Sequence, residues 1–190
     1  KFLGKKNDFL RVKLILDSFY NSKIFIEIDG NEISVGNNSF HSCSEIKNIS
    51  IKGKKISIKE QTFSECKNVT KVTIFGNSIS TSSNSFSSIK TLQFVWIEAE
   101  NISICQYSFN SCSNLNNLII RGHFTSIENS AFYLCSNFSN ITINGHHNSI
   151  ETKTFNHCNN LTNISIFGVY NVINKYAFYE CEGNQNLTIS

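Results

Sequence analysis

Seven cysteines and five histidines are the residues of this 190-residue chain that could support nucleophilic, redox or metal chemistry. Metal sites usually need Cys and His at short, repeated spacings such as Cys-x-x-Cys. The pairs His146-His147 and His157-Cys158 have no such companions, so exposed turn residues are the better interpretation. No Ser/His/Asp set can be placed either, because Asp is absent after Asp29. The sequence therefore predicts no enzyme activity, no catalytic residue, no metal site and no cofactor.

A strict period of 23 residues positions these side chains. Phenylalanine recurs at Phe40, Phe63, Phe86, Phe109, Phe132, Phe155 and Phe178. Three residues after each Phe come Cys43, Cys66, Ile89, Cys112, Cys135, Cys158 and Cys181. Aliphatic residues follow nine and eleven after each Phe, and Gly or Ala thirteen after the first six. A partial copy with Ile26, Ile28 and Gly30 precedes the first full copy. The chain is thus an internal repeat of one partial and about seven full copies.

Each copy predicts one coil of a solenoid. The alternating aliphatic positions are typical of a half-buried strand, and the following Gly permits a tight turn with positive φ. A second apolar pair, such as Ile56 and Ile58, predicts a short return strand. Each Phe and the residue three later share one face of a helical turn. Because one copy cannot bury its own apolar edge, the copies must stack, and equal positions then form ladders.

The repeat also resembles a known family. Ile46-x-x-Ile49-x-Ile51 resembles the strand motif of leucine-rich repeats. Phe109…Cys112…Leu115…Leu118…Ile120 and Ala131-Phe132…Cys135 are similar to the BspA-like class, over about residues 24–190. The resemblance implies a leucine-rich-repeat-like solenoid with a parallel β-sheet on its concave face, short return strands and helical turns. Members of this class are bacterial and protist surface proteins implicated in adhesion, and others are repeat arrays in multidomain proteins. The usual Asn ladder after the strand is missing here, and the Phe and Cys ladders replace it.

The two ends differ in what they predict. Residues 1–20 lie outside the repeat and are expected to cap the first coil of the array at 21–190. They fit a helical face (Phe9, Val12, Leu16 and Phe19) and a strand (Leu10, Val12, Leu14 and Leu16) equally well. The sequence stops within the strand Leu187–Ile189, so we expect further repeats or a neighbouring chain to cover that end. Since the chain contains no Met, Lys1 is not expected to be a natural start.

A partner is expected on the concave face. Positions 8, 10 and 12 after each Phe point outward there and are mostly small and polar. The exceptions are Phe75, Phe94, Trp96, Ile119 and Phe167, with Glu98 and Arg121 beside them. Aromatic residues and Arg are typical anchors of protein interfaces, so we predict a hot spot centred on Phe94 and Trp96. The alternative is that these rings pack across neighbouring strands for stability.

A second column on the same face consists of Asn48, Asn117, Asn140, Asn163 and Asn186. Side-chain amides at strand spacing can form hydrogen bonds along a sheet. A structural amide ladder is therefore favoured over a row of carbohydrate-binding residues, and so over a sugar site beside Trp96.

Charge and apolar content limit the classes of partner. The net charge is +3, and the basic cluster of Lys52, Lys54 and Lys55 is best interpreted as a solvated face, so no nucleic-acid partner is expected. No run of 18 apolar residues exists, so no membrane insertion is expected.

The compartment is indicated in two opposite ways. Six of the cysteines occupy the buried ladder as reduced thiols, and only Cys105 lies at a polar position. N-x-Ser/Thr sequons begin at Asn37, Asn48, Asn68, Asn101, Asn137, Asn140, Asn160, Asn163 and Asn186. Reduced thiols and crowded sequons favour a cytoplasmic or cytoskeletal location, whereas the resemblance implies the cell surface. We therefore predict a non-enzymatic protein-binding module: a surface adhesion or recognition domain, or alternatively an intracellular scaffold within a large, for instance cytoskeletal, assembly.

Overall fold

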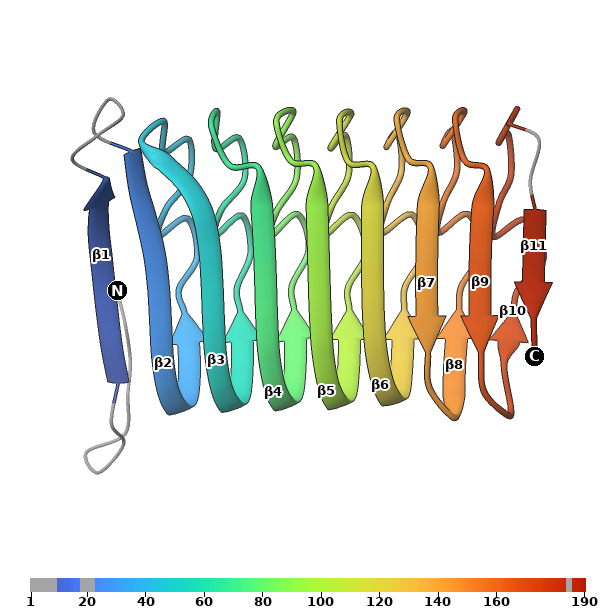
Figure 1. Cartoon of the computed structure of the whole chain (residues 1–190), viewed down its shortest axis with the longest axis horizontal. Coiled ribbons are helices and arrows are strands. Elements are labelled where there is room, and N and C mark those ends of the chain that lie inside the picture. The colour runs from blue at the N-terminus through green and yellow to red at the C-terminus, as the bar shows by residue number, and fades with distance from the viewer. Residues whose placement is uncertain (1–9, 18–22, 184–185) are drawn as a thin grey trace.

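The computed structural model describes residues 10–17, 23–183 and 186–190 and forms a single row of stacked coils (Figure 1). One sheet of eleven strands runs through it, in the order β1-β2-β3-β4-β5-β6-β7-β9-β11, with β8 paired to β6 and β10 paired to β8. The strands are β1 (Leu10–Asp17), β2 (Lys23–Val35), β3 (Ile46–Ile58), β4 (Lys71–Thr81), β5 (Phe94–Ile104), β6 (Asn117–Ile127), β7 (Asn140–Asn144), β8 (His147–Ile150), β9 (Asn163–Phe167), β10 (Val172–Ile173) and β11 (Asn186–Ile189). Every pairing after β1–β2 is parallel, which confirms the predicted repeat solenoid.

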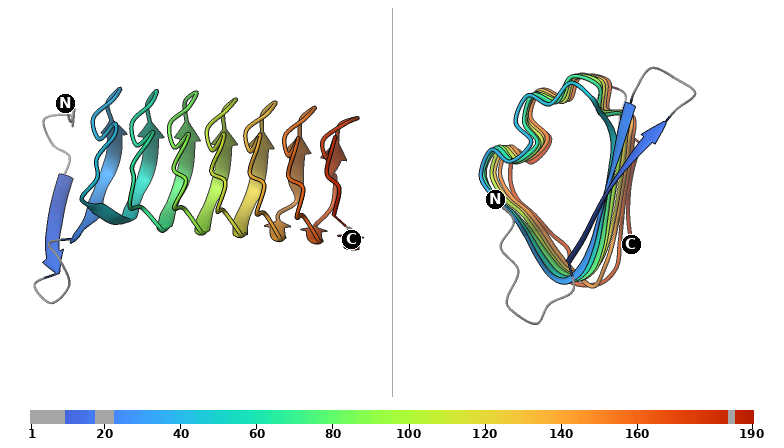
Figure 2. Two further views of the ribbon diagram at one scale, coloured as in Figure 1. Left: turned by 90° about the horizontal axis from the view of Figure 1, so that it is seen from above. Right: turned by 90° about the vertical axis from the view of Figure 1, so that its left-hand side faces the viewer.

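Each coil begins with a strand that bends and returns. In β3 the residues Ile49, Ile51, Ile56 and Ile58 are buried, so both halves turn their aliphatic side chains inward. β2 to β6 are continuous through the bend, whereas in the later coils the bend separates β7 from β8 and β9 from β10. Seen along the array, the coils superimpose with the strands on two sides and the turns on a third (Figure 2). The predicted return strands are therefore the second halves of β2 to β6, followed by β8 and β10.

The predicted helical turns differ in detail, because no helix occurs in the described parts of the chain. The residues two before and two after each of the seven Phe have left-handed backbone angles, for example Asn38 (φ 54°) and Ser42 (φ 56°) around Phe40. Left-handed residues cannot continue a right-handed helix. The N–H groups two residues after each of the first six Phe donate instead to the next coil, as Ser42 N–H does to the Ser64 carbonyl at 2.8 Å. The turns thus form a third ladder of inter-coil hydrogen bonds, and apart from Asn38, Asn84 and His157 their left-handed residues are types that do not signal positive φ.

The glycine column has a different cause from the one predicted. Positive φ was expected at these glycines, but among the described ones only Gly168 has it (φ 122°). The column is glycine because successive coils approach closely: a Cβ on Gly145 would lie 1.8 Å from the Gly122 carbonyl oxygen. At Ala99 a real Cβ is present, and the β4–β5 pairing skips Gly76 and Ala99. Close backbone approach, rather than turn geometry, therefore decides this position.

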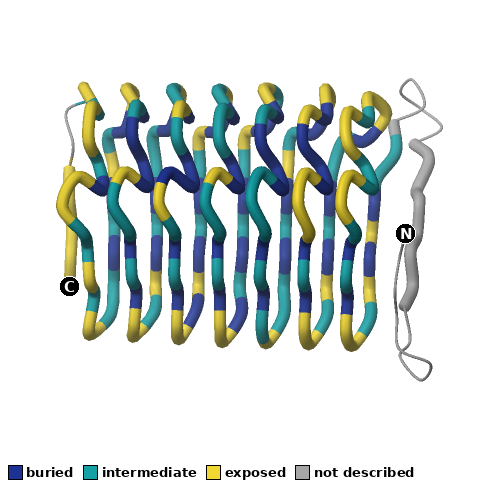
Figure 3. Tube along the Cα trace, turned by 180° about the vertical axis from the view of Figure 1, so that it is seen from behind, coloured by how far each residue is buried: buried dark blue, intermediate teal, exposed yellow. Residues whose placement is uncertain are grey.

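Buried positions recur in every coil (Figure 3), and the core combines the strand aliphatic residues with two side-chain ladders in the turns. The seven repeat Phe rings stack face to face with centroids 4.9–5.3 Å apart. Beside them the Cys thiols donate to carbonyls of the preceding coil, as Cys112 Sγ does to the Phe86 oxygen at 3.2 Å. Cys suits this column because it is small, apolar enough to bury and still a hydrogen-bond donor. Ile89 fills the same space without that donor and is also fully buried.

The ends of the array have different neighbours. β1 pairs antiparallel with β2 along its whole length, so residues 10–17 form a strand. Phe9 and Phe19, which the helical alternative used, lie outside the described residues. At the other end β11 pairs with β9, and Leu187 and Ile189 are 51% and 50% exposed. Within the described ranges no helix is long and apolar enough to cross a lipid bilayer.

Candidate functional site

The front face of the sheet, defined by positions 8, 10 and 12 after each Phe, carries the predicted partner residues. The parallel register places Phe75 beside Glu98 and Glu98 beside Arg121. The same register puts Trp96 beside Ile119 in the neighbouring column. We call Phe75, Phe94, Trp96, Glu98, Ile119 and Arg121 the front patch. It spans only three strands, β4 to β6.

Trp96 is the centre of the contacts in this patch. Its ring meets Phe75 edge to face, with centroids 5.2 Å apart and planes at 76°. The Arg121 guanidinium lies over the Trp96 ring, 5.5 Å from its centroid. The indole Nε1–H donates to Glu98 Oε2 at 3.2 Å. Three neighbours on three strands thus fix the orientation of one half-buried indole.

The charges of the patch are paired but accessible. Arg121 Nη1 lies 3.8 Å from Glu98 Oε2, and both side chains are about half exposed (56% and 46%). Solvent screening makes such a pair contribute little to stability. Both groups therefore keep the capacity to form charged hydrogen bonds to a partner, which Arg does with particular directionality.

The remaining predicted residues are less tightly joined to the patch. The Lys71 ammonium lies 5.4 Å from the centre of the Phe94 ring, so Phe94 belongs to a second small contact. Ile119 is half-buried beside Trp96. Phe167 lies in the row of Arg121, but Asn144 of β7 separates the two. Phe167 is therefore not part of the same cluster.

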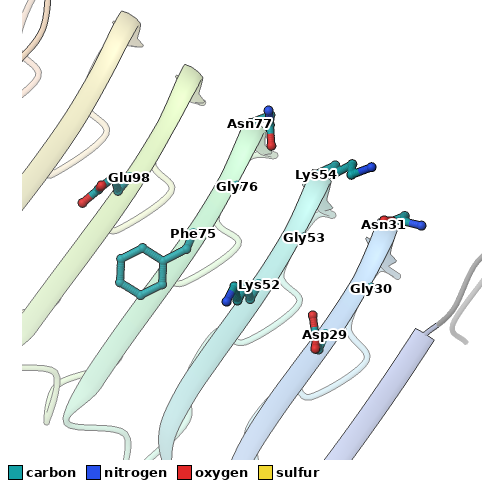
Figure 4. Close-up of a pocket in the computed structure, with 10 residues that line it drawn as sticks. All are labelled: Asp29, Gly30, Asn31, Lys52, Gly53, Lys54, Phe75, Gly76, Asn77 and Glu98. Carbon is teal, nitrogen blue, oxygen red and sulfur yellow. The ribbon is translucent and has the colours of Figure 1, made fainter.

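A shallow groove of about 420 Å³ lies beside the patch (Figure 4). It is lined by Asp29, Gly30, Asn31, Lys52, Gly53, Lys54, Phe75, Gly76, Asn77 and Glu98. The close-up shows Asp29, Lys52, Phe75 and Glu98 on successive strands of the front face, with Lys54 and Asn77 at the bend. Charges of both signs thus flank an aromatic ring. Sequence reasoning missed Asp29 and Lys52 as site residues, although Lys52 lies twelve after Phe40 and Asp29 pairs with it in register.

The fully buried thiols of the ladder are poor candidates for a reactive centre. Burial raises the pKa of Cys112 from its ordinary value of 9.0 to about 12, and burial raises the pKa of Cys135 and Cys158 well above that value. These thiols therefore stay protonated at neutral pH and are poor nucleophiles. Cys105 is half-buried near Ser83 and Glu128, and burial raises its pKa also.

The histidines lie at the edges of the coils. His157 Nε2 lies 2.7 Å from Glu180 Oε2, while the neighbouring Cys158 is buried. His123 and His146 approach to 4.9 Å between ring centroids. In the part of the chain that the structure describes, no three His, Cys, Asp or Glu side chains gather as a metal site would need.

The asparagine column forms hydrogen bonds along the sheet in its middle. Asn140 Nδ2 donates to Asn117 Oδ1 at 3.0 Å, and Asn163 Nδ2 donates to Asn140 Oδ1 at 2.9 Å. This confirms the amide ladder for these three positions. A second ladder that the sequence analysis did not single out joins Asn114, Asn137 and Asn160.

Comparison with known proteins gives two findings. The family model described as BspA type leucine-rich repeat region matches in six copies, over residues 14–135 and 79–190. Among solved structures, the crystal structure of the T. pallidum leucine-rich repeat protein is similar, with a TM-score of 0.50 and 15% sequence identity over 90% of this chain and 91% of that one. Identity this low supports the shared fold alone. A search of curated proteins gives no match.

Proposed function

Since the chain belongs to the BspA-type leucine-rich repeat family, we propose that it is a non-enzymatic module that binds a protein partner through the front patch. The observation that carries this proposal is the arrangement of Trp96. A large ring contacts both Phe75 and Arg121 on a face whose other side chains are mostly small and polar. Pre-ordered aromatic anchors lose little side-chain entropy when a partner covers them.

The partner is expected to be an accessible protein segment with both charged and apolar groups. Glu98 and Arg121 provide one acceptor and one donor group next to Trp96. The adjoining groove adds Asp29 and Lys52, so the surface has no dominant sign of charge. Such a surface favours a mixed polar and apolar segment over nucleic acid, which needs a dominant positive field.

We propose surface adhesion or recognition as the setting of this binding, on the strength of the family. An intracellular scaffold is the second candidate, and the thiol ladder favours it. Each described repeat thiol from Cys66 onward donates to a carbonyl of the preceding coil, an arrangement that uses reduced Cys. Intact mass of the protein from its natural source distinguishes them. Added hexose mass, or the mass loss of disulfide formation, would support the surface module. An unglycosylated chain with reduced thiols would support the intracellular scaffold.

Binding through the patch can be tested with three matched variants. Immobilised wild type, Trp96→Ala, Trp96→Phe and Ser165→Ala are exposed to an extract of the natural source, and retained proteins are quantified by mass spectrometry. Ser165 lies in the column of Trp96, three strands away, and serves as the control. A true partner is retained by wild type and Ser165→Ala and lost from Trp96→Ala.

The purified partner then provides the affinity measurement. Losing a central aromatic anchor costs about 2 kcal/mol, or roughly 30-fold in Kd. Trp96→Phe keeps an edge-to-face partner for Phe75 and reports how much of the effect is packing. If every retained protein binds Trp96→Ala as well as wild type, the patch is a packing feature and the proposal fails.

We further propose that another coil, from further repeats or a neighbouring chain, covers the edge at β11. The backbone N–H groups of Phe178 and Glu180 find no acceptor among the described residues, although the equivalent groups of all six earlier coils donate to the next coil. Leu187 and Ile189 are half exposed beside them. The isolated chain is expected to self-associate in sedimentation experiments, and Leu187→Lys to reduce this. A stable wild-type monomer would contradict the proposal.

A further inference from the structure

The outer side of the return strands carries an unbroken column of serines. They are Ser34, Ser57, Ser80, Ser103, Ser126 and Ser149, and each pairs in register with the next. All six are half-buried and alternate with buried residues. The hydroxyls of Ser103 and Ser126 have no protein partner among the described residues. The hydroxyls of Ser80 and Ser149 donate to the Ile56 carbonyl and to Glu151 Oε1 and can still accept. The column therefore presents hydroxyl groups at strand spacing, of which those of Ser103 and Ser126 can both donate and accept.

A stack of rings ends beside this column. Phe124, which is 46% exposed, stacks on His147 with centroids 4.8 Å apart and planes at 11°. His147 in turn stacks on Tyr170 at 4.9 Å and 7°. The stack stops at Phe124, because its register partner in the preceding strand is Asn101. One face of the Phe124 ring is thus covered by His147, and the other is turned toward Asn101.

His123 does not cover that open face. Its ring centroid lies 4.5 Å from that of Phe124 and 5.9 Å from that of His147. A ring on the far side of Phe124 would lie much farther from His147 than this. His123 is therefore beside the stack, and the next ring position, above Asn101, is unfilled by protein.

That position opens into a groove of about 380 Å³. Its lining includes Ser78, Ser80, Asn101, Ser103, Ser126 and one wall formed by Phe124 and His147, and no Asp, Glu, Lys or Arg contributes to it. The groove therefore has no acidic or basic Asp, Glu, Lys or Arg side chain, and it presents hydroxyl groups and one amide. An aromatic face closes one end of it. It is separate from the front patch, which lies on the other half of the strands.

We infer that this groove binds a neutral saccharide, with a pyranose ring stacked on the open face of Phe124 and its hydroxyls on the serine column. A pyranose has an apolar C–H face and a rim of hydroxyls, which matches both surfaces at once. A peptide matches them less well. The return strands of β4 to β6 are paired on both sides, so no strand edge is open for backbone pairing. An aromatic side chain could cover Phe124 but would leave the serine hydroxyls without partners.

The sugar ring could come from two sources. It could belong to a free or partner-borne glycan, or it could be attached to Asn101, since Asn101-Ile102-Ser103 is a sequon. Asn101 is exposed, and its amide has no protein partner within the described residues. By contrast, the Nδ2 groups of Asn140 and Asn163 already donate to the amide ladder. Both sources place the same chemistry on Phe124, and the experiment separates them.

The free source is tested on protein produced in bacteria, with intact mass confirming a bare Asn101. A panel of neutral oligomers of glucose, mannose and N-acetylglucosamine is titrated by saturation-transfer NMR. At least one is expected to bind with transfer to its ring C–H protons. Phe124→Ala should weaken it about tenfold, the upper range of an aromatic stacking contact. Asn101→Gln removes the sequon but keeps an amide and should retain binding, and Tyr179→Ala, an exposed ring on the turn side, should leave it unchanged.

The attached source is tested on protein secreted from eukaryotic cells. A hexosamine-containing mass increment that disappears in Asn101→Gln, with ring-current shifts on the first sugar that disappear in Phe124→Leu, would assign the groove to the attached glycan. Phe124→Leu keeps apolar bulk, so loss of folding does not confuse the result, and thermal unfolding of each variant checks this. The inference is overturned if no saccharide of the panel binds and Asn101 carries no stacked sugar, or if Phe124→Ala binds like wild type.

Discussion

Replacing Phe109 by Ala tests whether the phenylalanine ladder holds the array together. Phe109 is fully buried, and its ring stacks on Phe86 at 4.9 Å and on Phe132 at 5.1 Å. Truncating a buried Phe costs about 3–5 kcal/mol in lost burial and cavity formation. Each lost stacking contact adds about 0.5–1.5 kcal/mol. Because these contributions overlap, we expect a loss near the upper end, about 5 kcal/mol, which approaches the whole stability of many domains.

The assay is urea unfolding followed by the fluorescence of Trp96, the single Trp, which lies in the coil between Phe86 and Phe109. A parallel thermal melt should show a fall in melting temperature of about 10–20 °C for a chain of this size. Phe109→Leu keeps most of the volume and should cost far less. Phe178→Ala removes a half-buried ring stacked on Phe155 and should mainly loosen the last coil. A loss at Phe109 below about 2 kcal/mol, or equal to that at Phe178, would refute the ladder argument.

Three further outcomes follow from the coil geometry. Gly145→Ala should destabilise the protein by about 3 kcal/mol, because the new Cβ meets a backbone oxygen at 1.8 Å. Ala99→Gly in the same column should cost only about 1 kcal/mol. Equal losses of stability in thermal unfolding would disprove the close-approach explanation. The raised pKa of Cys112, about 12 against 9.0, means that the unfolded chain releases this proton first. Stability should therefore be intact below pH 9 and fall as the pH rises toward 12, with a slope that Cys112→Ala reduces; a pH-independent denaturation midpoint over that range would argue against it. Asn140→Ala removes two ladder hydrogen bonds and should lower the free energy of unfolding by about 1 kcal/mol, since both bonds are partly accessible to water. An unchanged denaturation midpoint would show that the ladder does not contribute to stability.

The candidate site shows how far a column of residues can be interpreted without coordinates. The 23-residue period places Phe75, Glu98 and Arg121 in one row, and the structure has them in register. The period could not say that Trp96 would lean on Phe75 and accept Arg121 over its face, because side-chain rotamers depend on neighbours on both sides. It also could not separate Phe167 from the patch except by counting strands. The groove at Phe124 was missed altogether, since it depends on a small residue, Asn101, standing where the next ring would be.

The sequence by itself determined the architecture, because a repeat with one buried edge per copy can bury it only by stacking in register. It also determined which columns are buried, since strand Ile and Val alternate with polar residues and Phe and Cys recur every 23 residues. Tertiary structure alone decided the backbone of the turns, where residues as different as Leu134 and Lys153 adopt left-handed angles. Those angles are set by hydrogen bonds to the next coil and not by local preference. The same holds for the glycine column, whose requirement comes from the distance to the neighbouring coil, a quantity that no single repeat contains.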